Sequence, residues 1–321
     1  MTLFHLLQLT GGFIYLLMGA DLLVRGAVGL ARRAAVPPIV VALTLVALGT
    51  SLPELVVSVQ AVYQGYTGIV LGNVVGSNIA NVLLVGGVSA IVYPLAFPGG
   101  SVRRDALVMI LASALFFLVC LVEGLNRSMG VVFLLGLIAF LIPTVRDAAR
   151  TSQEGAGTRA PLEIVLGLPR RRPVIFLFIA AGIIGLPVGS RLVVDSAVII
   201  AGNLGISDAV VGVTIIAFST SLPELATTVV AAVRKETEVA LGTLVGSNIF
   251  NILGIMGIST LLAPAGIPVP PLFPFLDLPV MLISSLMVAG FIWLRRPIGR
   301  KAGVVFTGIY LAYLATLFVL G

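Results

Sequence analysis

The sequence is almost devoid of the side chains that build soft-metal sites and covalent catalytic centres. Its 321 residues include one cysteine, Cys120, and one histidine, His5. A single cysteine excludes a disulfide within the chain and any cysteine-based metal cluster. An HExxH motif needs a second histidine, and neither a Ser-His pair nor a cysteine nucleophile is supported. The catalytic groups of a hydrolase are therefore missing, and we expect neither an enzyme nor a bound cofactor.

Charged residues are also scarce. Only 10% of the residues are Asp, Glu, Lys or Arg and 59% are hydrophobic, which leaves too little polar surface for a soluble globule of this length. Apolar stretches of about 20 residues, long enough to cross a hydrocarbon core of about 30 Å as a helix, recur along the chain. We expect an all-α membrane protein with ten transmembrane helices, approximately at residues 5–30, 38–63, 68–95, 105–122, 129–145, 173–202, 209–232, 238–263, 277–294 and 303–320.

The basic residues gather on one side of the expected membrane. Of the 19 Lys and Arg residues, only Arg127 falls in a connection on the opposite side, and only Arg25 and Arg191 fall within spans. The positive-inside bias then places both termini outside a cell (inner or plasma) membrane that the chain crosses many times. Orientation and attraction to anionic membrane lipid account for the net charge of +6, so we expect no nucleic-acid partner.

The two halves of the chain are copies of one unit. Residues 44–94 align without gaps on residues 214–264, with 23 of 51 positions identical, and both copies contain the motifs TSLPEL and GSNIxN. If each half has five spans, an odd number, the second half enters the membrane in the opposite sense. We therefore expect one membrane domain of two inverted five-helix repeats, at residues 1–145 and 173–321, joined by a cytoplasmic basic linker at residues 146–172.

Two glutamates, Glu54 and Glu224, are the candidate cation ligands. A carboxylate inside a bilayer costs about 2.5–3.5 kcal/mol on insertion scales, so an intramembrane acid is a functional candidate by default. Each glutamate follows a proline, Pro53 or Pro223, whose missing N–H opens the helix and frees backbone oxygens. Hydroxyl and amide groups beside these breaks or on a neighbouring helix face would complete the site: Thr50, Ser51, Ser77, Asn81, Thr220, Ser221, Ser247 and Asn251.

An all-oxygen cluster with two acids suits a hard cation such as Ca²⁺ or Na⁺. Two carboxylates neutralise one Ca²⁺, whereas the empty site holds two like charges out of bulk water. The empty carrier should therefore rarely change the side of the membrane that its site faces. This predicts obligatory exchange of the first cation for a second cation or for protons. The alternative interpretations are a structural ion pair for each glutamate and interhelical hydrogen bonding for the serines and asparagines.

Other features of the spans have a structural interpretation. Asp21 and Arg25 align with Arg191 and Asp195, so an i,i+4 acid–base pair recurs with its charges exchanged. We interpret each as a mutually neutralising pair. Glycines in the GSNI-containing spans are expected to let neighbouring helices approach closely: Gly72, Gly76, Gly242 and Gly246.

With its paired TSLPE and GSNI motifs, the chain resembles the calcium/cation antiporter superfamily, in its sodium/calcium exchanger branch and especially its compact prokaryotic members. The resemblance covers essentially the whole chain. It implies a ten-helix fold in which Glu54 and Glu224 bridge a central Ca²⁺ and the first and sixth spans slide. It further implies calcium and sodium subsites flanked by Asn81 and Asn251 and completed by the carbonyls of Ala47 and Ala217 and the hydroxyls of Thr50, Ser51, Ser77, Thr220, Ser221 and Ser247.

One position departs from that pattern. Some relatives carry Asp where this chain has Asn251, so a third acid is absent, which argues against potassium co-transport and leaves the protonation of the central site open. The expected function is secondary active antiport of Ca²⁺ against Na⁺ by alternating access at a midplane site. A proton-coupled Ca²⁺ or cation exchanger on the same fold is the alternative. The expected partners are these ions and membrane lipid, with a monomer as the working unit.

Overall fold

The structure is a computed structural model that describes residues 2–97, 100–122, 124–154, 167–203, 220–271 and 273–320. The regular elements in these ranges are helices, as the composition predicts. The first half of the chain contains α1 (Thr2–Ala34), α2 (Pro38–Val41), η1 (Ala42–Val46), α3 (Ala47–Thr50), α4 (Leu52–Tyr63), α5 (Thr67–Ala80), η2 (Asn81–Val85), α6 (Gly86–Val92), α7 (Gly100–Val122) and α8 (Arg127–Glu154). The second half contains α9 (Arg172–Asn203), α12 (Leu222–Val233), α13 (Thr237–Ile249), η5 (Phe250–Met256), α14 (Gly257–Leu262), α15 (Asp277–Trp293) and α16 (Arg300–Leu320).

Seven helices of the described ranges are long and apolar enough to cross a membrane. An eighth span results if Pro38–Thr50 and Leu52–Tyr63, which are bent by 42°, are counted together, and α12 and α15 are shorter apolar helices. The expected span at 209–232 is described only from Thr220 onward. Helix α8 continues past residue 145 to Glu154, so the first part of the expected linker at 146–172 is helical. Residues 155–166 of that linker lie outside the described ranges.

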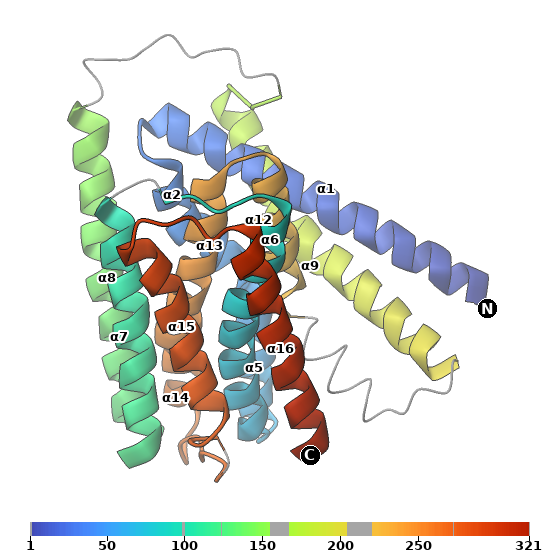
Figure 1. Ribbon diagram of the computed structural model, residues 1–321, viewed down its shortest axis with the longest axis vertical. Helices are drawn as coiled ribbons and strands as arrows, with labels where there is room; N and C mark the ends of the chain where they lie inside the picture. The colour runs from blue at the N-terminus through green and yellow to red at the C-terminus, as the bar shows by residue number, and fades with distance from the viewer. Residues whose placement is uncertain are drawn as a thin grey trace.

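Helices α1 and α9 lie side by side and run obliquely to the other long helices (Figure 1). Glycines bring the two backbones together. A Cβ on Gly182 would lie 2.6 Å from the Cβ of Leu23, and a Cβ on Gly189 would lie 2.6 Å from the backbone nitrogen of Leu16. Small residues give helices in a membrane their close contacts, so this pair forms a tightly packed unit beside the main bundle.

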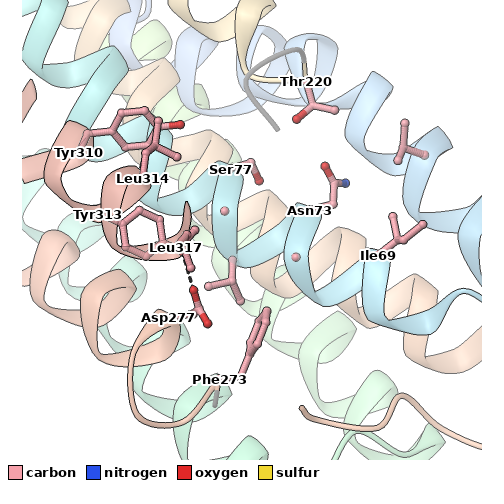
Figure 2. A pocket seen from close by; sticks show the side chains of 14 residues that line it. Ile69, Asn73, Ser77, Thr220, Phe273, Asp277, Tyr310, Tyr313, Leu314 and Leu317 are labelled. Atoms are coloured by element: carbon pink, nitrogen blue, oxygen red, sulfur yellow. Dashed lines mark hydrogen bonds between the residues drawn. The ribbon is translucent and has the colours of Figure 1, made fainter. Parts of the chain in front are cut away.

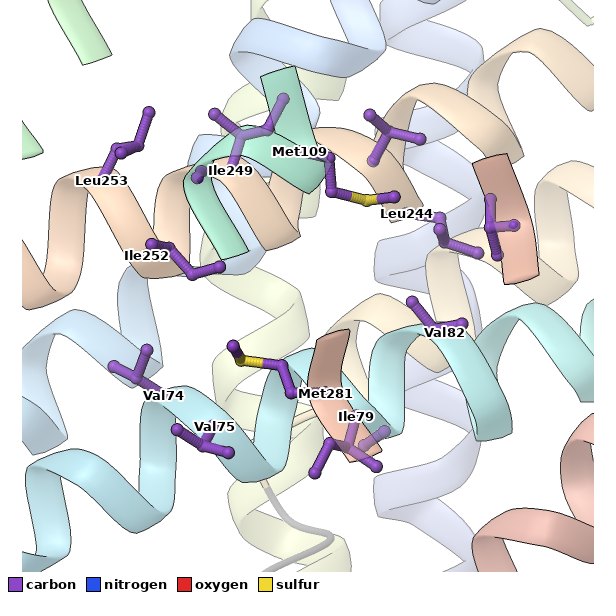
Figure 3. Packing of buried hydrophobic residues seen from close by; sticks show 14 of the residues in the cluster. Val74, Val75, Ile79, Val82, Met109, Leu244, Ile249, Ile252, Leu253 and Met281 are labelled. Carbon is purple, nitrogen blue, oxygen red and sulfur yellow. The ribbon is translucent and has the colours of Figure 1, made fainter. Parts of the chain in front are cut away.

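The main bundle has its apolar core between α5 with η2 and α13 with η5 (Figure 3). Val74, Val75 and Ile79 of α5 are buried in this core. Leu244 and Ile249 of α13 belong to the same cluster. Met109 of α7 and Met281 of α15 also belong to it, so these two helices pack against the core. These two GSNI-containing helices are therefore held at the centre of the molecule.

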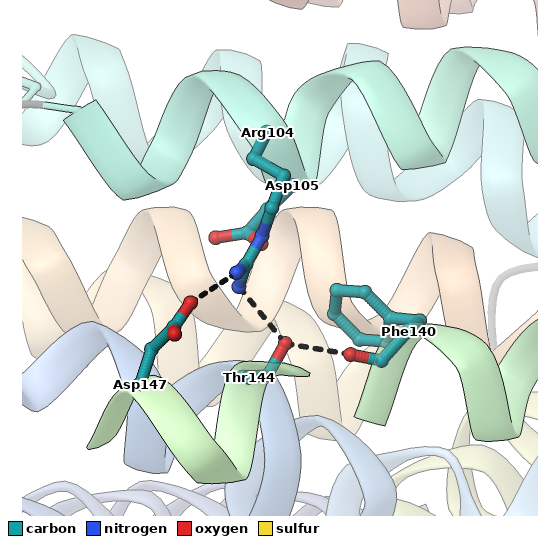
Figure 4. A network of polar contacts seen from close by, with 5 residues as sticks. All are labelled: Arg104, Asp105, Phe140, Thr144 and Asp147. Carbon is teal, nitrogen blue, oxygen red and sulfur yellow. Dashed lines mark hydrogen bonds and ion pairs between the residues drawn. The ribbon is translucent and has the colours of Figure 1, made fainter. Parts of the chain in front are cut away.

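A polar network ties α7 to α8 away from this core (Figure 4). Arg104 forms ion pairs with Asp147 of α8 and with its neighbour Asp105, and its Nη2 donates to the Thr144 hydroxyl at 3.1 Å. The Thr144 hydroxyl in turn donates to the carbonyl of Phe140 at 2.8 Å. Asp105 is 1% exposed, so the guanidinium supplies the charge compensation that a buried carboxylate requires.

The glycines of the second GSNI-containing helix are closely packed. A Cβ on Gly242 would lie 2.6 Å from the Cβ of Ala42, and a Cβ on Gly246 would lie 2.7 Å from the Cβ of Ala47. The expectation of close helix approach is confirmed for this copy. For Gly72 and Gly76 it stays a prediction, because the counterparts of the covering segment, residues 209–217, lie outside the described residues.

Candidate cation site

Each glutamate-containing helix begins at a break of the same geometry. Ser51 has φ −85° and ψ 4°, and Ser221 has φ −85° and ψ 2°, so neither residue continues a helix. Pro53 and Pro223 stand in the first turns of α4 and α12, where a missing N–H is tolerated. In the first half, α3 ends at Thr50, so the expected opening of the helix before Glu54 is present. Ser221 has the same geometry before Glu224, and the residues that precede Thr220 lie outside the described ranges.

The two carboxylates are buried in the bundle. Glu54 is 0% exposed and Glu224 is 1% exposed, and the two are close enough to repel each other electrostatically. Neither takes part in any ion pair that joins described residues. The interpretation of these acids as members of structural ion pairs therefore gains no support.

Several oxygens of this cluster have no hydrogen-bond partner among the described residues. They are Oε1 and Oε2 of Glu54, Oε2 of Glu224, Oδ1 of Asn81, Oδ1 of Asn251 and Oγ of Ser221. A buried polar atom without a partner costs about 1–3 kcal/mol, and more when it is charged. Buried oxygens that lack a hydrogen-bond donor are what an oxygen site offers to a cation.

Hydrogen bonds across the repeat bring the two motifs together. The Ser51 hydroxyl donates to Oε1 of Glu224 at 3.3 Å, and the Thr50 hydroxyl lies 3.5 Å from that of Ser247. The Asn251 amide donates to the Ser77 hydroxyl at 3.0 Å. All six side chains are buried. The hydroxyls that form these interhelical hydrogen bonds are therefore the same ones that are expected to act as cation ligands.

The last asparagine of each GSNIxN motif lies in a π-helical segment. Asn81 is the first residue of η2, and Asn251 is the second residue of η5. A π-helical turn widens the helix and commonly occurs at functional sites, because it reorients side chains and loosens the backbone hydrogen bonding. Neither composition nor periodicity signals such a turn, so it was not predictable from the sequence.

Three further asparagines belong to the site and were missed. Asn73 donates to the backbone carbonyl of Glu54 at 3.0 Å and to the Ser58 hydroxyl at 2.9 Å, which ties α5 to α4. Oδ1 of Asn248 accepts from the Asn81 amide at 3.3 Å, and Asn78 donates to the carbonyl of Val74 at 2.6 Å. Asn78 and Asn248 stand inside the repeated motif, so the repeat itself was the signal that pointed to them.

The remaining expected ligands are distributed as follows. The Ala47 carbonyl accepts from the backbone nitrogen of Ser51 at 3.0 Å and from the Thr50 hydroxyl at 3.3 Å. Thr220 is partly buried at the start of the described segment before α12. Ala217 lies outside the described residues. Its carbonyl therefore stays a prediction.

The acid–base pair of α1 does more than neutralise itself. Arg25 pairs with Asp21 at 3.0 Å, and Nε of Arg25 donates to the carbonyl of Gly167 at 2.6 Å. Asp21 also accepts from Nε of Arg234 at 2.5 Å, at the C-terminal end of α12. The equivalent pair, Arg191 and Asp195, is 3.8 Å apart with side chains 85% and 54% exposed.

The donor set determines what the cluster can bind. The described residues contain no group of three or more His, Cys, Asp or Glu side chains that could hold a metal, so the site has two carboxylates and otherwise neutral oxygens. Hydroxyl, amide and carboxylate oxygens are the ligands of hard cations, and a donor set without nitrogen or sulfur disfavours zinc and copper.

Comparison with known proteins identifies the family. The model of the family described as "Sodium/calcium exchanger protein" matches residues 4–145 and 174–319. The chain is 36% identical to the inner membrane protein YrbG of Escherichia coli over 96% of this chain and 94% of that protein. It is 33% identical to the sodium/calcium exchanger MaX1 of Methanosarcina acetivorans, over 96% of each chain.

A solved structure has the same fold. The sodium-calcium exchanger NCX_Mj, soaked with Na⁺ and Sr²⁺, superposes with a TM-score of 0.83 at 33% sequence identity, covering 98% of this chain and 99% of that one. The matches extend over both halves of the sequence, including both glutamate motifs. The chain belongs to the sodium/calcium exchanger family of the calcium/cation antiporter superfamily, in its prokaryotic branch, and is a multi-pass membrane antiporter and not an enzyme.

Proposed function

We propose that this protein exchanges Ca²⁺ for Na⁺ by alternating access to a site formed by Glu54 and Glu224. The observation that carries the proposal is the set of buried, unpartnered oxygens on these two glutamates and on Asn81 and Asn251, as far as the chain is described. Two ionised carboxylates balance the charge of one Ca²⁺. Without a cation, two like charges stand close together with no base beside them, which disfavours movement of the empty carrier.

The relatives favour these two ions. The names of MaX1 and of NCX_Mj both describe sodium/calcium exchangers, and both proteins align along nearly the full chain. The repeated motifs of this chain supply carboxylate, hydroxyl and amide oxygens, which suit both ions. The roles of Thr50, Ser51, Ser77, Thr220, Ser221, Ser247 and the carbonyls of Ala47 and Ala217 as individual ligands belong to this proposal.

The architecture that we propose is ten helices in two inverted repeats. Its support is the offset of 170 residues between the motifs, the equal dihedral angles at Ser51 and Ser221, and the contacts between the halves at Ser51–Glu224 and Ser77–Asn251. The distribution of basic residues supports both termini on the outer side of the membrane, with the linker at 146–172 in the cytoplasm. A single chain contributes all of these site residues, which supports a monomer as the working unit.

The coupling ion is tested by transport into proteoliposomes. Purified protein is reconstituted with Na⁺ inside, and uptake of ⁴⁵Ca²⁺ is measured after dilution into medium without Na⁺, at equal pH on both sides. We expect rapid uptake that ceases when K⁺ replaces the internal Na⁺. A parallel experiment imposes a pH gradient without Na⁺. Full uptake driven by the pH gradient, with no further effect of Na⁺, would instead establish the proton-coupled exchanger.

A further inference from the structure

A cavity borders the candidate cation site and is not needed to explain exchange. It has a volume of about 480 Å³, within the range of small-molecule sites. Its walls come from α4, α5, α15 and α16 and from residues that precede α12 and α15 (Figure 2). Ser77 and Thr220, two of the expected cation ligands, line it at one end. Gly72 and Gly76, which carry no side chain, form part of its wall.

A buried carboxylate stands in the wall of this cavity. Asp277, the first residue of α15, is 7% exposed and accepts a hydrogen bond of 2.5 Å from the Tyr313 hydroxyl (Figure 2). No ion pair within the described segments includes Asp277. A phenol offsets part of the cost of burying a carboxylate but supplies no positive charge. A cation in the cavity would supply it.

The rest of the lining favours an organic cation. Tyr310, Tyr313, Leu314 and Leu317 follow the spacing i, i+3, i+4, i+7, so they form one face of α16. Phe273 adds a third aromatic ring near Asp277. Aromatic faces attract cations, and the leucines, together with Val57 and Ile69, offer apolar surface to a hydrocarbon tail.

A bare metal ion fits this cavity poorly. Ca²⁺ takes about six to eight oxygen ligands, and Asp277 has one phenol beside it and apolar side chains around it. A lipid tail alone would leave the carboxylate without a charge partner. An ammonium group on an apolar tail satisfies both parts of the lining.

We propose that this cavity binds an organic ammonium ion, with its charged group on Asp277 and its apolar tail along α16. The bound tail lies beside Gly72 and Gly76 and next to Ser77 and Thr220, so occupancy obstructs the adjacent cation site and inhibits transport. This binding does not depend on which ion is exchanged.

Calorimetric titration of the purified full-length protein tests the proposal. The probe is 4-phenylbutylammonium, and 4-phenylbutanol is the neutral ligand with the same tail. We expect the ammonium to bind at least about tenfold more tightly than the alcohol, and Asp277→Asn to remove this preference. Tyr313→Phe, which keeps the carboxylate, should retain it, and Asp195→Asn is the control for loss of an exposed acid.

Two further measurements keep the proposal testable if Asp277→Asn misfolds and test whether the cavity is instead a metal site. Leu314→Trp fills the cavity without altering Asp277 and should weaken both ligands, so the proposal stays testable if Asp277→Asn is unstable. Glu54→Gln protein, titrated with the ammonium in the presence of Ca²⁺, should bind it as before. Equal binding of both probes, an ammonium preference that survives in Asp277→Asn, or displacement by Ca²⁺ in Glu54→Gln would each overturn the proposal.

Discussion

The Ser51 hydroxyl of the first repeat lies 3.3 Å from Oε1 of Glu224 in the second. The reciprocal contact is absent in the described part of the chain, because the Ser221 hydroxyl and both carboxylate oxygens of Glu54 have no hydrogen-bond partner. The site is therefore asymmetric in this conformation, although the sequence motifs that form it are identical.

Neutralising either glutamate is expected to abolish exchange. In Glu54→Gln and in Glu224→Gln, one carboxylate is left to balance a divalent cation in a buried site, so Ca²⁺ binding loses half of its charge compensation. We expect Na⁺-driven ⁴⁵Ca²⁺ uptake into proteoliposomes to fall to background in both variants. The protein should remain folded in size-exclusion chromatography, because the amide is isosteric with the acid.

Asp195→Asn is the matched control for these variants. It removes an acid of α9 whose side chain is 54% exposed. Its uptake should equal that of the wild type. Wild-type uptake in either glutamine variant would refute the assignment of Glu54 and Glu224 as cation ligands.

Exchange is expected to be inhibited at low pH, and Asn251→Asp is expected to strengthen that inhibition. Protons and Ca²⁺ compete for the same carboxylates, and a third carboxylate beside two others repels them and takes up protons more readily. The ratio of ⁴⁵Ca²⁺ uptake at about pH 6 to that at about pH 8 should be lower in Asn251→Asp than in the wild type. Equal ratios would mean that Asn251 does not adjoin the cation site. Ser259, a buried serine of the same span, offers the control Ser259→Ala.

The ion pair between Asp21 and Arg234 is expected to stabilise the docking of α1 on α12. The two side chains are 29% and 36% exposed, so the coupling should be that of a partly exposed pair, about 0.2–1 kcal/mol. A double-mutant cycle with Asp21→Asn and Arg234→Gln, measured by thermal unfolding in detergent, gives this coupling directly. The same cycle on Arg191 and Asp195, which are more exposed and 3.8 Å apart, should give a value near zero. Equal couplings in the two cycles would contradict a special role for Arg234.

A glycine substitution should reveal the close packing of the second copy of the repeated helix. In Gly242→Ala the new methyl would meet the Cβ of Ala42 at 2.6 Å and the carbonyl oxygen of Ile39 at 2.9 Å, so we expect a loss of about 1–3 kcal/mol in the free energy of unfolding. Gly308→Ala, at an exposed position of α16, should be neutral or stabilise by up to about 1 kcal/mol through helix propensity. Thermal unfolding of both variants under the same conditions tests the difference. Similar destabilisation by both would mean that Gly242 is not closely packed.

Much of the site was predictable because polar residues inside apolar spans are costly and therefore conspicuous. Glu54 and Glu224 stood out in this way, and the internal repeat pointed to the hydroxyls and asparagines around them. Asn73 was not predictable, since its partner in the second copy is Thr243 and it donates to the backbone of Glu54 and to Ser58. Its role depends on which face of α5 packs against α4.

The charged pair in α1 illustrates the same limit. An i,i+4 spacing predicts the bond between Asp21 and Arg25, because both lie on one helix face. The second bond of Asp21, to Arg234, joins residues far apart in the chain and depends on how α1 crosses α12. No local pattern contains that information.

By itself, the sequence determined the class of molecule, its repeat and the chemistry of its site, because hydropathy, motif spacing and ligand type are local properties. The tertiary structure alone decided which distant segments contact each copy of the motif. Gly242 and Gly246 are covered by the segment from Ile39 to Ala47, and Gly72 and Gly76 line a cavity that reaches Asp277. Such contacts join residues far apart in the chain, so they depend on which neighbours the rest of the fold brings to each motif and not on the motif itself.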